Sequence, residues 1–219
     1  MENVFNRFQK LFTERCNRIP LLNLREDSIR YDFFYAVTEI KKLNPWDIQL
    51  ENSIDKNSFI QRNNRSRKRS ENPQIDLVID KLKICAEFGL FRRNKNENGN
   101  INKTARTVKM LNDMIRLGLE SYHTNRNAYF ICVADNKMLG HQLKSKMIGK
   151  FPSHYKITNE IISQQLKQKT SDFDTRFVSR FNELRLYIKS DLIYNEQILA
   201  KKIDRETRIM IWKVIPRNI

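Results

Sequence analysis

The stretch NPQIDLVIDKLKICAEFGLFR, residues Asn72–Arg92, predicts two short strands joined by a tight turn. Its first half alternates with period two, as a strand with one buried face does. One face carries Ile75, Leu77 and Ile79, and the other carries Asp76, Val78 and Asp80. The second half alternates in the same way, with Ile84, Ala86, Phe88 and Leu90 opposite Cys85, Glu87, Gly89 and Phe91. A turn at Asp80 and Lys81 would pair the two strands as a hairpin.

The hairpin would bring two acidic residues, Asp76 and Glu87, close together on one face. Adjacent carboxylates repel each other, so the arrangement costs stability unless a divalent cation lies between them. An Asp between Ile75 and Leu77 in a buried strand also needs a polar or charged partner. Carboxylates held around Mg²⁺ are the apparatus of metal-assisted phosphodiester hydrolysis. The pattern therefore favours a metal site at these two residues.

The charge of the chain points to an anionic partner. Lys and Arg number 41 against 25 Asp and Glu, which gives a formal net charge of +16 over 219 residues. A fold does not require such an excess, so it indicates a partner, with nucleic acid first and an anionic membrane surface second. The length suits one domain, or a domain with a modest appendage.

Several absences in the sequence predict a cytoplasmic protein that does not enter a membrane. No apolar run approaches the roughly 18 residues that a membrane span needs. The N-terminus, MENVFNRFQKLF, lacks the pattern of a signal peptide. The cysteines Cys16, Cys85 and Cys132 lack metal-ligand spacing and are expected to be reduced, buried thiols.

Apolar periodicity predicts an α/β protein with a mixed sheet of four to five strands flanked by helices. In residues 1–150 we expect helices at 3–15, about 28–43, 104–122 and 136–148, and strands at 46–51, at the hairpin and at 128–133. Residues 151–219 are expected to form a mostly helical C-terminal extension packed on this core. Its predicted elements are helices at 157–168, 174–188 and 191–203, then a strand at 208–215.

A polar, basic segment precedes the hairpin and has two compatible interpretations. It is a solvated loop, or it is an arm that follows a phosphate backbone and becomes ordered on binding. The candidate nucleic-acid contacts are Arg62, Arg65, Arg67, Lys68 and Arg69, together with Arg92 and Arg93 after the hairpin.

The order helix, strand, strand, strand, helix, strand over residues 24–135 resembles the core of the PD-(D/E)xK nuclease superfamily, which includes many restriction endonucleases. Glu26 in REDSIRYDFF, Asp76 in PQIDLVI and Glu87 in CAEFG carry the resemblance. It implies that Asp76, Glu87 and the backbone carbonyl of Phe88 bind one or two Mg²⁺ ions, with Mn²⁺ as a substitute. It also implies that Glu26 assists this metal site. An acid in the first turn of a helix is favoured by the helix dipole as well, and Glu39 is the alternative on the same helix.

The chain departs from the family pattern at one position. The family places a Lys two residues after the Glu, where it activates the attacking water and stabilises negative charge. Here that position is Gly89, so the cation must come from another element. Lys109 on the following helix is the first candidate, with Lys103 and Arg92 as alternatives.

The resemblance implies a Mg²⁺-dependent DNA endonuclease, most naturally a type II restriction endonuclease that acts as a homodimer. A second hypothesis, consistent with Gly89, is a decayed nuclease that binds DNA or RNA without cutting it. A third is an RNA-processing or RNA-binding factor, because basic charge alone does not separate DNA from RNA.

Overall fold

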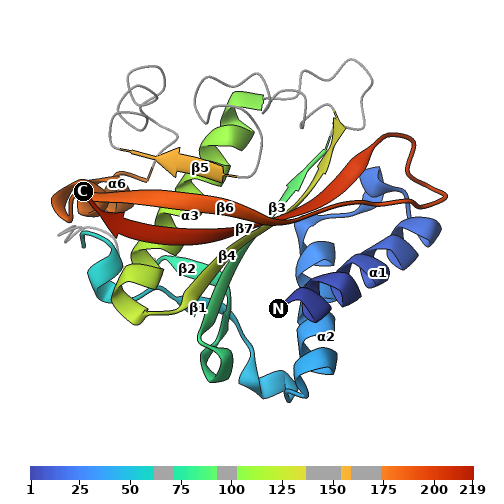
Figure 1. Cartoon of the computed structure of the whole chain (residues 1–219), viewed down its shortest axis with the longest axis horizontal. Coiled ribbons are helices and arrows are strands. Elements are labelled where there is room, and N and C mark those ends of the chain that lie inside the picture. Colours follow the sequence, from blue (N-terminus) through green and yellow to red (C-terminus); the bar gives the residue numbers. More distant parts are fainter. Residues whose placement is uncertain (62–71, 93–102, 137–153, 159–173) are drawn as a thin grey trace.

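The computed structural model describes residues 1–61, 72–92, 103–136, 154–158 and 174–219. These residues form an α/β protein around a seven-stranded mixed sheet with the order β1-β2-β3-β4-β7-β6-β5 (Figure 1). The strands are β1 (Gln49–Ser53), β2 (Gln74–Ile79), β3 (Ile84–Phe91), β4 (Asn127–Asp135), β5 (His154–Ile157), β6 (Leu186–Gln197) and β7 (Thr207–Asn218). Only β3 and β4 run parallel, and the other neighbouring strands are antiparallel. The predicted mixed sheet flanked by helices is confirmed, with more strands than expected.

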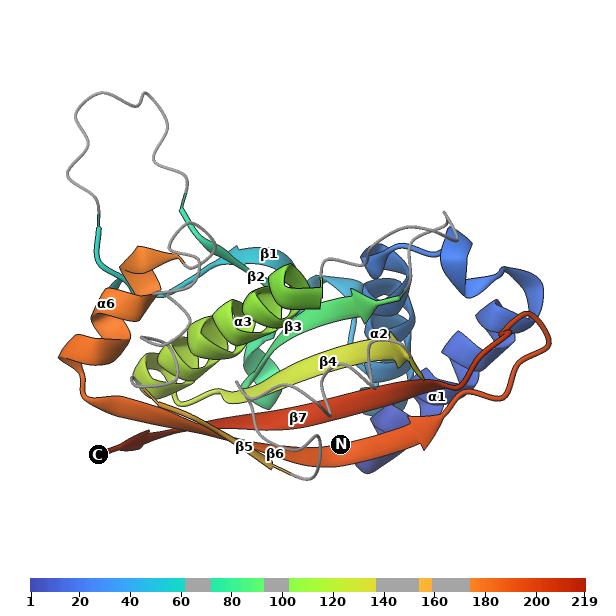
Figure 2. The ribbon, with the colours of Figure 1, turned by 90° about the horizontal axis from the view of Figure 1, so that it is seen from above.

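Helices cover both faces of the sheet (Figures 1 and 2). On one face lie α1 (Glu2–Arg18) and α2 (Glu26–Lys41), and on the other lie α3 (Lys103–Thr124) and α6 (Thr175–Glu183). The central strand β4 shows why both faces need cover. Tyr129 and Ile131 pack in the cluster under α1 and α2, whereas Phe130 and Cys132 pack in the cluster under α3. All four side chains are buried, as expected for a strand between two layers of helices.

The predicted hairpin is present. β2 and β3 pair antiparallel, with Leu77 opposite Ala86 and Ile79 opposite Ile84. A single 3₁₀ turn, Asp80–Leu82, joins them, and Lys83 closes the turn in the left-handed region with φ of 51°. One detail of the prediction is wrong, because Ile75 packs in the α3-side cluster and Leu77 in the α2-side cluster.

The helices near the hairpin begin and end close to their predicted positions. α2 has Glu26 and Asp27 in its first turn, where acidic side chains interact favourably with the helix dipole. It ends at Lys41 and is capped by Lys42, which adopts a left-handed conformation with φ of 53°. Arg15 of α1 donates to the carboxylate of the buried Asp32 at 2.7 Å and so ties α1 to α2. Trp46, predicted in a strand, lies instead in a 3₁₀ turn, and β1 starts three residues later.

The C-terminal part differs most from the prediction. The prediction of a helix at 191–203 is wrong, because residues 186–197 form the long strand β6. The helix expected at 174–188 is shorter than predicted and corresponds to α6. The helix expected at 157–168 does not begin at Ile157, because this residue ends strand β5. The strand expected at 208–215 is confirmed as part of β7, which pairs with β4. β6 and β7 thus extend the central sheet, and the described C-terminal residues are mostly strand. The predicted helix 136–148 and residues 159–168 lie almost wholly outside the described residues.

Cys16, Cys85 and Cys132 are free and buried, as predicted. Among the described residues, no helix is both long enough and apolar enough to cross a membrane.

Candidate metal and phosphate site

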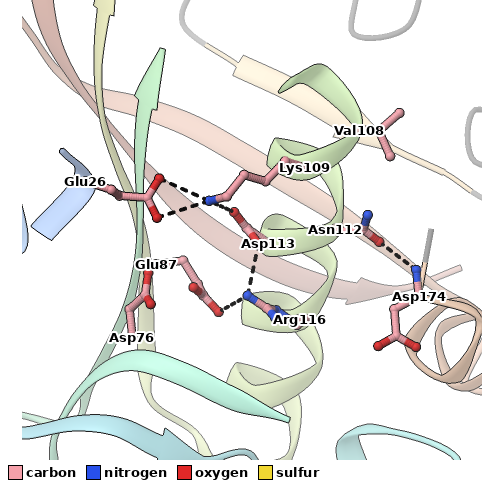
Figure 3. A pocket seen from close by; sticks show the side chains of 9 residues that line it. All are labelled: Glu26, Asp76, Glu87, Val108, Lys109, Asn112, Asp113, Arg116 and Asp174. Atoms are coloured by element: carbon pink, nitrogen blue, oxygen red, sulfur yellow. Dashed lines mark hydrogen bonds and ion pairs between the residues drawn. The ribbon is translucent and has the colours of Figure 1, made fainter. Parts of the chain in front are cut away.

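A cavity of about 520 Å³ opens between the hairpin and α3 (Figure 3). Its lining is strongly charged for a partly enclosed space. The residues that line it are Glu26, Asp76, Glu87, Val108, Lys109, Asn112, Asp113, Arg116 and Asp174. All four candidate catalytic residues, Glu26, Asp76, Glu87 and Lys109, are in this set. They reach the cavity from α2, β2, β3 and α3 respectively.

Asp76 and Glu87 come from the two strands of the hairpin. Leu77 pairs with Ala86, so Asp76 and Glu87 occupy the next positions along the two strands. Asp76 accepts a hydrogen bond at 2.9 Å from the backbone N–H of Phe88, which fixes one carboxylate oxygen against β3. Glu87 is only 2% exposed. The hairpin therefore holds two carboxylates together at the wall of the cavity.

Two arginines that the sequence analysis did not select offset the expected repulsion. Arg30 of α2 donates to Oδ1 of Asp76 at 2.7 Å. Arg116 of α3 donates to Oε1 of Glu87 at 2.7 Å. Each carboxylate therefore has a guanidinium partner without a metal ion, which the sequence analysis did not foresee.

Arg30 also links the site to the edge strand. Its Nη1 donates to Oε1 of Glu51 in β1 at 3.2 Å. Glu51 has φ of 52°, a conformation that non-glycine residues rarely adopt. The strained residue thus places its carboxylate on the same guanidinium that holds Asp76.

The electrostatic setting of Glu87 favours its neutral form. Burial is the main cause that raises the pKa of Glu87 well above its usual value, and the charges of Asp113 and Asp76 raise the pKa further. The guanidinium of Arg116 acts in the opposite direction and lowers this pKa. A second cation beside Glu87 would also lower the pKa of Glu87, as Arg116 does.

Lys109 extends from α3 across the cavity toward Glu26 (Figure 3). Its Nζ donates to the carbonyl oxygen of Phe88 at 3.1 Å and to Oε1 of Glu26 at 3.4 Å. It also donates to Oδ2 of Asp113 at 3.0 Å. Burial alone would lower the pKa of Lys109, but the charges of Asp113 and Glu26 outweigh burial and raise the pKa. The ammonium is therefore held in its charged form at the cavity.

Gly89, the position where the family carries its Lys, has no room for a side chain. An added Cβ would lie 2.9 Å from Cζ of Phe91 and 3.2 Å from Cζ of Phe130. Both rings are fully buried and stack with their centroids 6.2 Å apart. A residue larger than Gly would thus displace the aromatic core under α3, and the cation at the site comes from that helix instead.

The structure places the other predicted residues elsewhere. Glu39, the alternative to Glu26, pairs with Arg7 at 2.8 Å and does not line the cavity. Arg92 donates to the carbonyl oxygen of Leu24 at 3.1 Å and does not line the cavity either. The side chain of Lys103 is not described. The predicted nucleic-acid contacts Arg62, Arg65, Arg67, Lys68, Arg69 and Arg93 lie outside the described residues.

Asp113 and Arg116 also line the site, and neither was a candidate site residue from the sequence. Asp113 is 3% exposed, so it faces the protein interior and not solvent. The two residues follow Lys109 by four and seven positions, the spacing of one helix face. Once Lys109 was chosen as a site residue, this spacing could have identified both.

The oxygen atoms at the site are of the kind that Mg²⁺ and Mn²⁺ prefer. They are the carboxylates of Asp76 and Glu87 and the carbonyl of Phe88, and cationic side chains already contact all three. These oxygens are of a type that suits a divalent cation, which would have to displace the cationic side chains that contact them. Across the described ranges, no group of three or more Asp, Glu, His or Cys side chains is spaced to hold a metal ion. Comparison of the chain with family models, with curated proteins and with solved structures finds no match.

Proposed function

We propose that the protein is a divalent-metal-dependent nuclease of the restriction-endonuclease-like class that hydrolyses phosphodiester bonds in DNA. One observation carries the proposal: Glu26, Asp76, Glu87 and Lys109, each from a different element, line a single cavity. The element order α2-β1-β2-β3-α3-β4 agrees with the order on which the resemblance rests. The net charge of +16 supports a polyanionic substrate.

In this proposal the hairpin provides the metal ligands. Asp76, Glu87 and the carbonyl of Phe88 would hold Mg²⁺ or Mn²⁺, which supplies Lewis-acid stabilisation and a water of lowered pKa. Lys109 stabilises the negative charge that develops on the phosphate, the role that Gly89 does not fill. Glu26 accepts from Lys109 at 3.4 Å and keeps the ammonium on the hairpin side of the cavity.

The finer proposal is a cytoplasmic type II restriction endonuclease that acts as a homodimer. Each copy has one such cavity, so two copies are needed to cut both strands of a duplex in one encounter. DNA is the proposed substrate because the resemblance is to DNA-cleaving enzymes.

A second candidate is a protein on the same scaffold that binds nucleic acid without cutting it. The pairs Arg30–Asp76 and Arg116–Glu87 favour it, because both proposed metal ligands already have a cationic partner. A metal ion would have to compete with these two guanidinium groups.

Incubation of the purified protein with supercoiled plasmid and Mg²⁺ or Mn²⁺ tests the proposal. We expect nicked and linear products from the wild type, and none in the presence of a chelator or from Asp76→Ala. The matched control is Asp204→Ala, which changes an exposed carboxylate far along the chain and should cut like the wild type. If the wild type retains DNA in a binding assay but cleaves neither DNA nor RNA with either metal, the second candidate is favoured.

A further inference from the structure

Asp113 is a buried carboxylate between the two cations that α3 presents to the cavity (Figure 3). Its Oδ2 accepts from Nζ of Lys109 and its Oδ1 accepts from Nη2 of Arg116, both at 3.0 Å. One oxygen thus faces each cation. Each cation also has other partners. Lys109 contacts Phe88 and Glu26, and Arg116 contacts Glu87.

The spacing on the helix explains how one carboxylate reaches both cations. Lys109 precedes Asp113 by four residues and Arg116 follows it by three, and side chains at these separations are neighbours on a helix surface. A carboxylate that is 3% exposed is costly unless it is paired and hydrogen-bonded. Here the pairing is to two side chains that line the proposed site, and not to residues of the surrounding core.

We infer that Asp113 is a positioning residue, which directs Lys109 to the Phe88 carbonyl and Arg116 to Glu87 so that both cations face the phosphate of the substrate. This inference rests on the proposed function. The side chain of Lys109 is 36% exposed, so its long flexible stem has solvent-facing alternatives to the cavity. The carboxylate of Asp113 excludes those alternatives by holding Nζ from one side while Glu26 holds it from the other.

The contacts of Lys109 and Arg116 indicate what removal of the Asp113 carboxylate would do. Lys109 would keep one carboxylate partner, Glu26 at 3.4 Å, in place of two. Arg116 would keep its contact with Glu87 but lose the carboxylate that holds it from its own helix. Loss of the Asp113 carboxylate should therefore release Nζ of Lys109 from the carbonyl oxygen of Phe88.

Crystal structures of the wild type and of Asp113 variants measure this effect without metal or substrate. We expect Nζ of Lys109 to lose its hydrogen bond to the Phe88 carbonyl oxygen in Asp113→Asn and to keep it in Asp113→Glu, which retains the carboxylate. Asp191→Asn is the matched control, because Asp191 pairs with Lys189 and not with Lys109. An unchanged contact between Lys109 and Phe88 in Asp113→Asn would overturn the inference.

If Asp113→Asn does not fold, the wild-type crystal structure still tests the inference. Nζ of Lys109 should lie on the carboxylate of Asp113 and on the Phe88 carbonyl oxygen, and a Lys109 side chain that points to solvent would show that Asp113 does not hold the ammonium. In the cleavage assay, Asp113→Asn should lower kcat by about 10-fold or more with little change in KM, the range for groups that orient a catalytic side chain. A wild type that does not cut would remove the proposed function but leave the structural result to stand.

Discussion

The ammonium of Lys109 lies 3.1 Å from the carbonyl oxygen of Phe88, on the strand that carries Glu87. The carbonyl belongs to the residue between Glu87 and Gly89, so a cation from α3 reaches the backbone beside the position where this chain has Gly in place of the Lys of the nuclease pattern. The same contact places Nζ beside one of the oxygens proposed to bind metal. The ammonium and the proposed metal ligands thus share one side of the cavity.

Lys109→Ala should reduce cleavage by a factor on the order of 10², the range for loss of one group that stabilises developing charge. DNA affinity should change far less, because one phosphate contact among many contributes little. Single-turnover cleavage and a binding titration with the same duplex would separate the two effects. Lys10→Ala on α1 is the control and should leave cleavage unchanged, since Lys10 does not line the cavity. Normal cleavage by Lys109→Ala would mean that Lys109 does not fill this role.

Divalent metal should raise the melting temperature of the wild type, because a ligand that binds only the folded state stabilises it. Asp76→Asn and Glu87→Gln should abolish this response, since each removes a charged ligand from the pair. Thermal unfolding with and without Mg²⁺ or Mn²⁺ measures it. Asp47→Asn, which removes a carboxylate paired with Lys81 outside the cavity, should respond like the wild type. Retention of the full response in both hairpin variants would mean that the ion binds elsewhere.

The strands and helices around the site were predictable because their patterns are local. The hairpin follows from period-two alternation, and α3 from apolar residues at helical spacing between Thr104 and Tyr122. The prediction of a helix at 191–203 failed for a physical reason. Strand β6 has polar residues on its exposed side and a bulge between Leu192 and Tyr194, which breaks the alternation and mimics a helical pattern. Pairing with β7, the next strand in the chain, decides its structure.

The candidate site was only partly predictable. Acids on paired strands can be recognised from the sequence, but their partners cannot, because Arg30 and Arg116 reach them from separate helices. Asp113 was not selected as a site residue, because a charged residue on a helix usually faces water. Its burial follows from the position of α3 over the hairpin, which no local pattern specifies.

The free energy of unfolding should depend on pH in part because of Glu120. Burial is the main cause that raises the pKa of Glu120, although the backbone N–H of Asp55 and the guanidinium of Arg126 oppose it. The unfolded chain therefore releases this proton at lower pH than the folded protein does. The stabilisation is complete below the unfolded pKa and is lost as pH rises through the raised folded pKa.

Glu120→Gln should remove this contribution, so stability should fall less steeply with rising pH than in the wild type. Urea unfolding at a series of pH values measures the slope. Glu14→Gln, on the exposed side of α1, is the control and should keep the wild-type slope. The same slope in Glu120→Gln and in the wild type would contradict the argument.

Gly89→Lys, which restores the residue type of the family pattern, should destabilise the protein and should not rescue Lys109→Ala. The new side chain would collide with Phe91 and Phe130, and overpacking of a buried core typically costs about 1–3 kcal/mol. Urea unfolding would measure the loss, and cleavage by the double variant Gly89→Lys, Lys109→Ala should stay at the level of Lys109→Ala.

Combining Gly89→Lys with Phe91→Ala tests the cause, because neighbouring substitutions that relieve a shared clash are not additive. We expect this pair to be more stable than the sum of its two single effects. If Gly89→Lys is as stable as the wild type and restores cleavage, then position 89 does accept a cation and the assignment of that role to α3 is wrong.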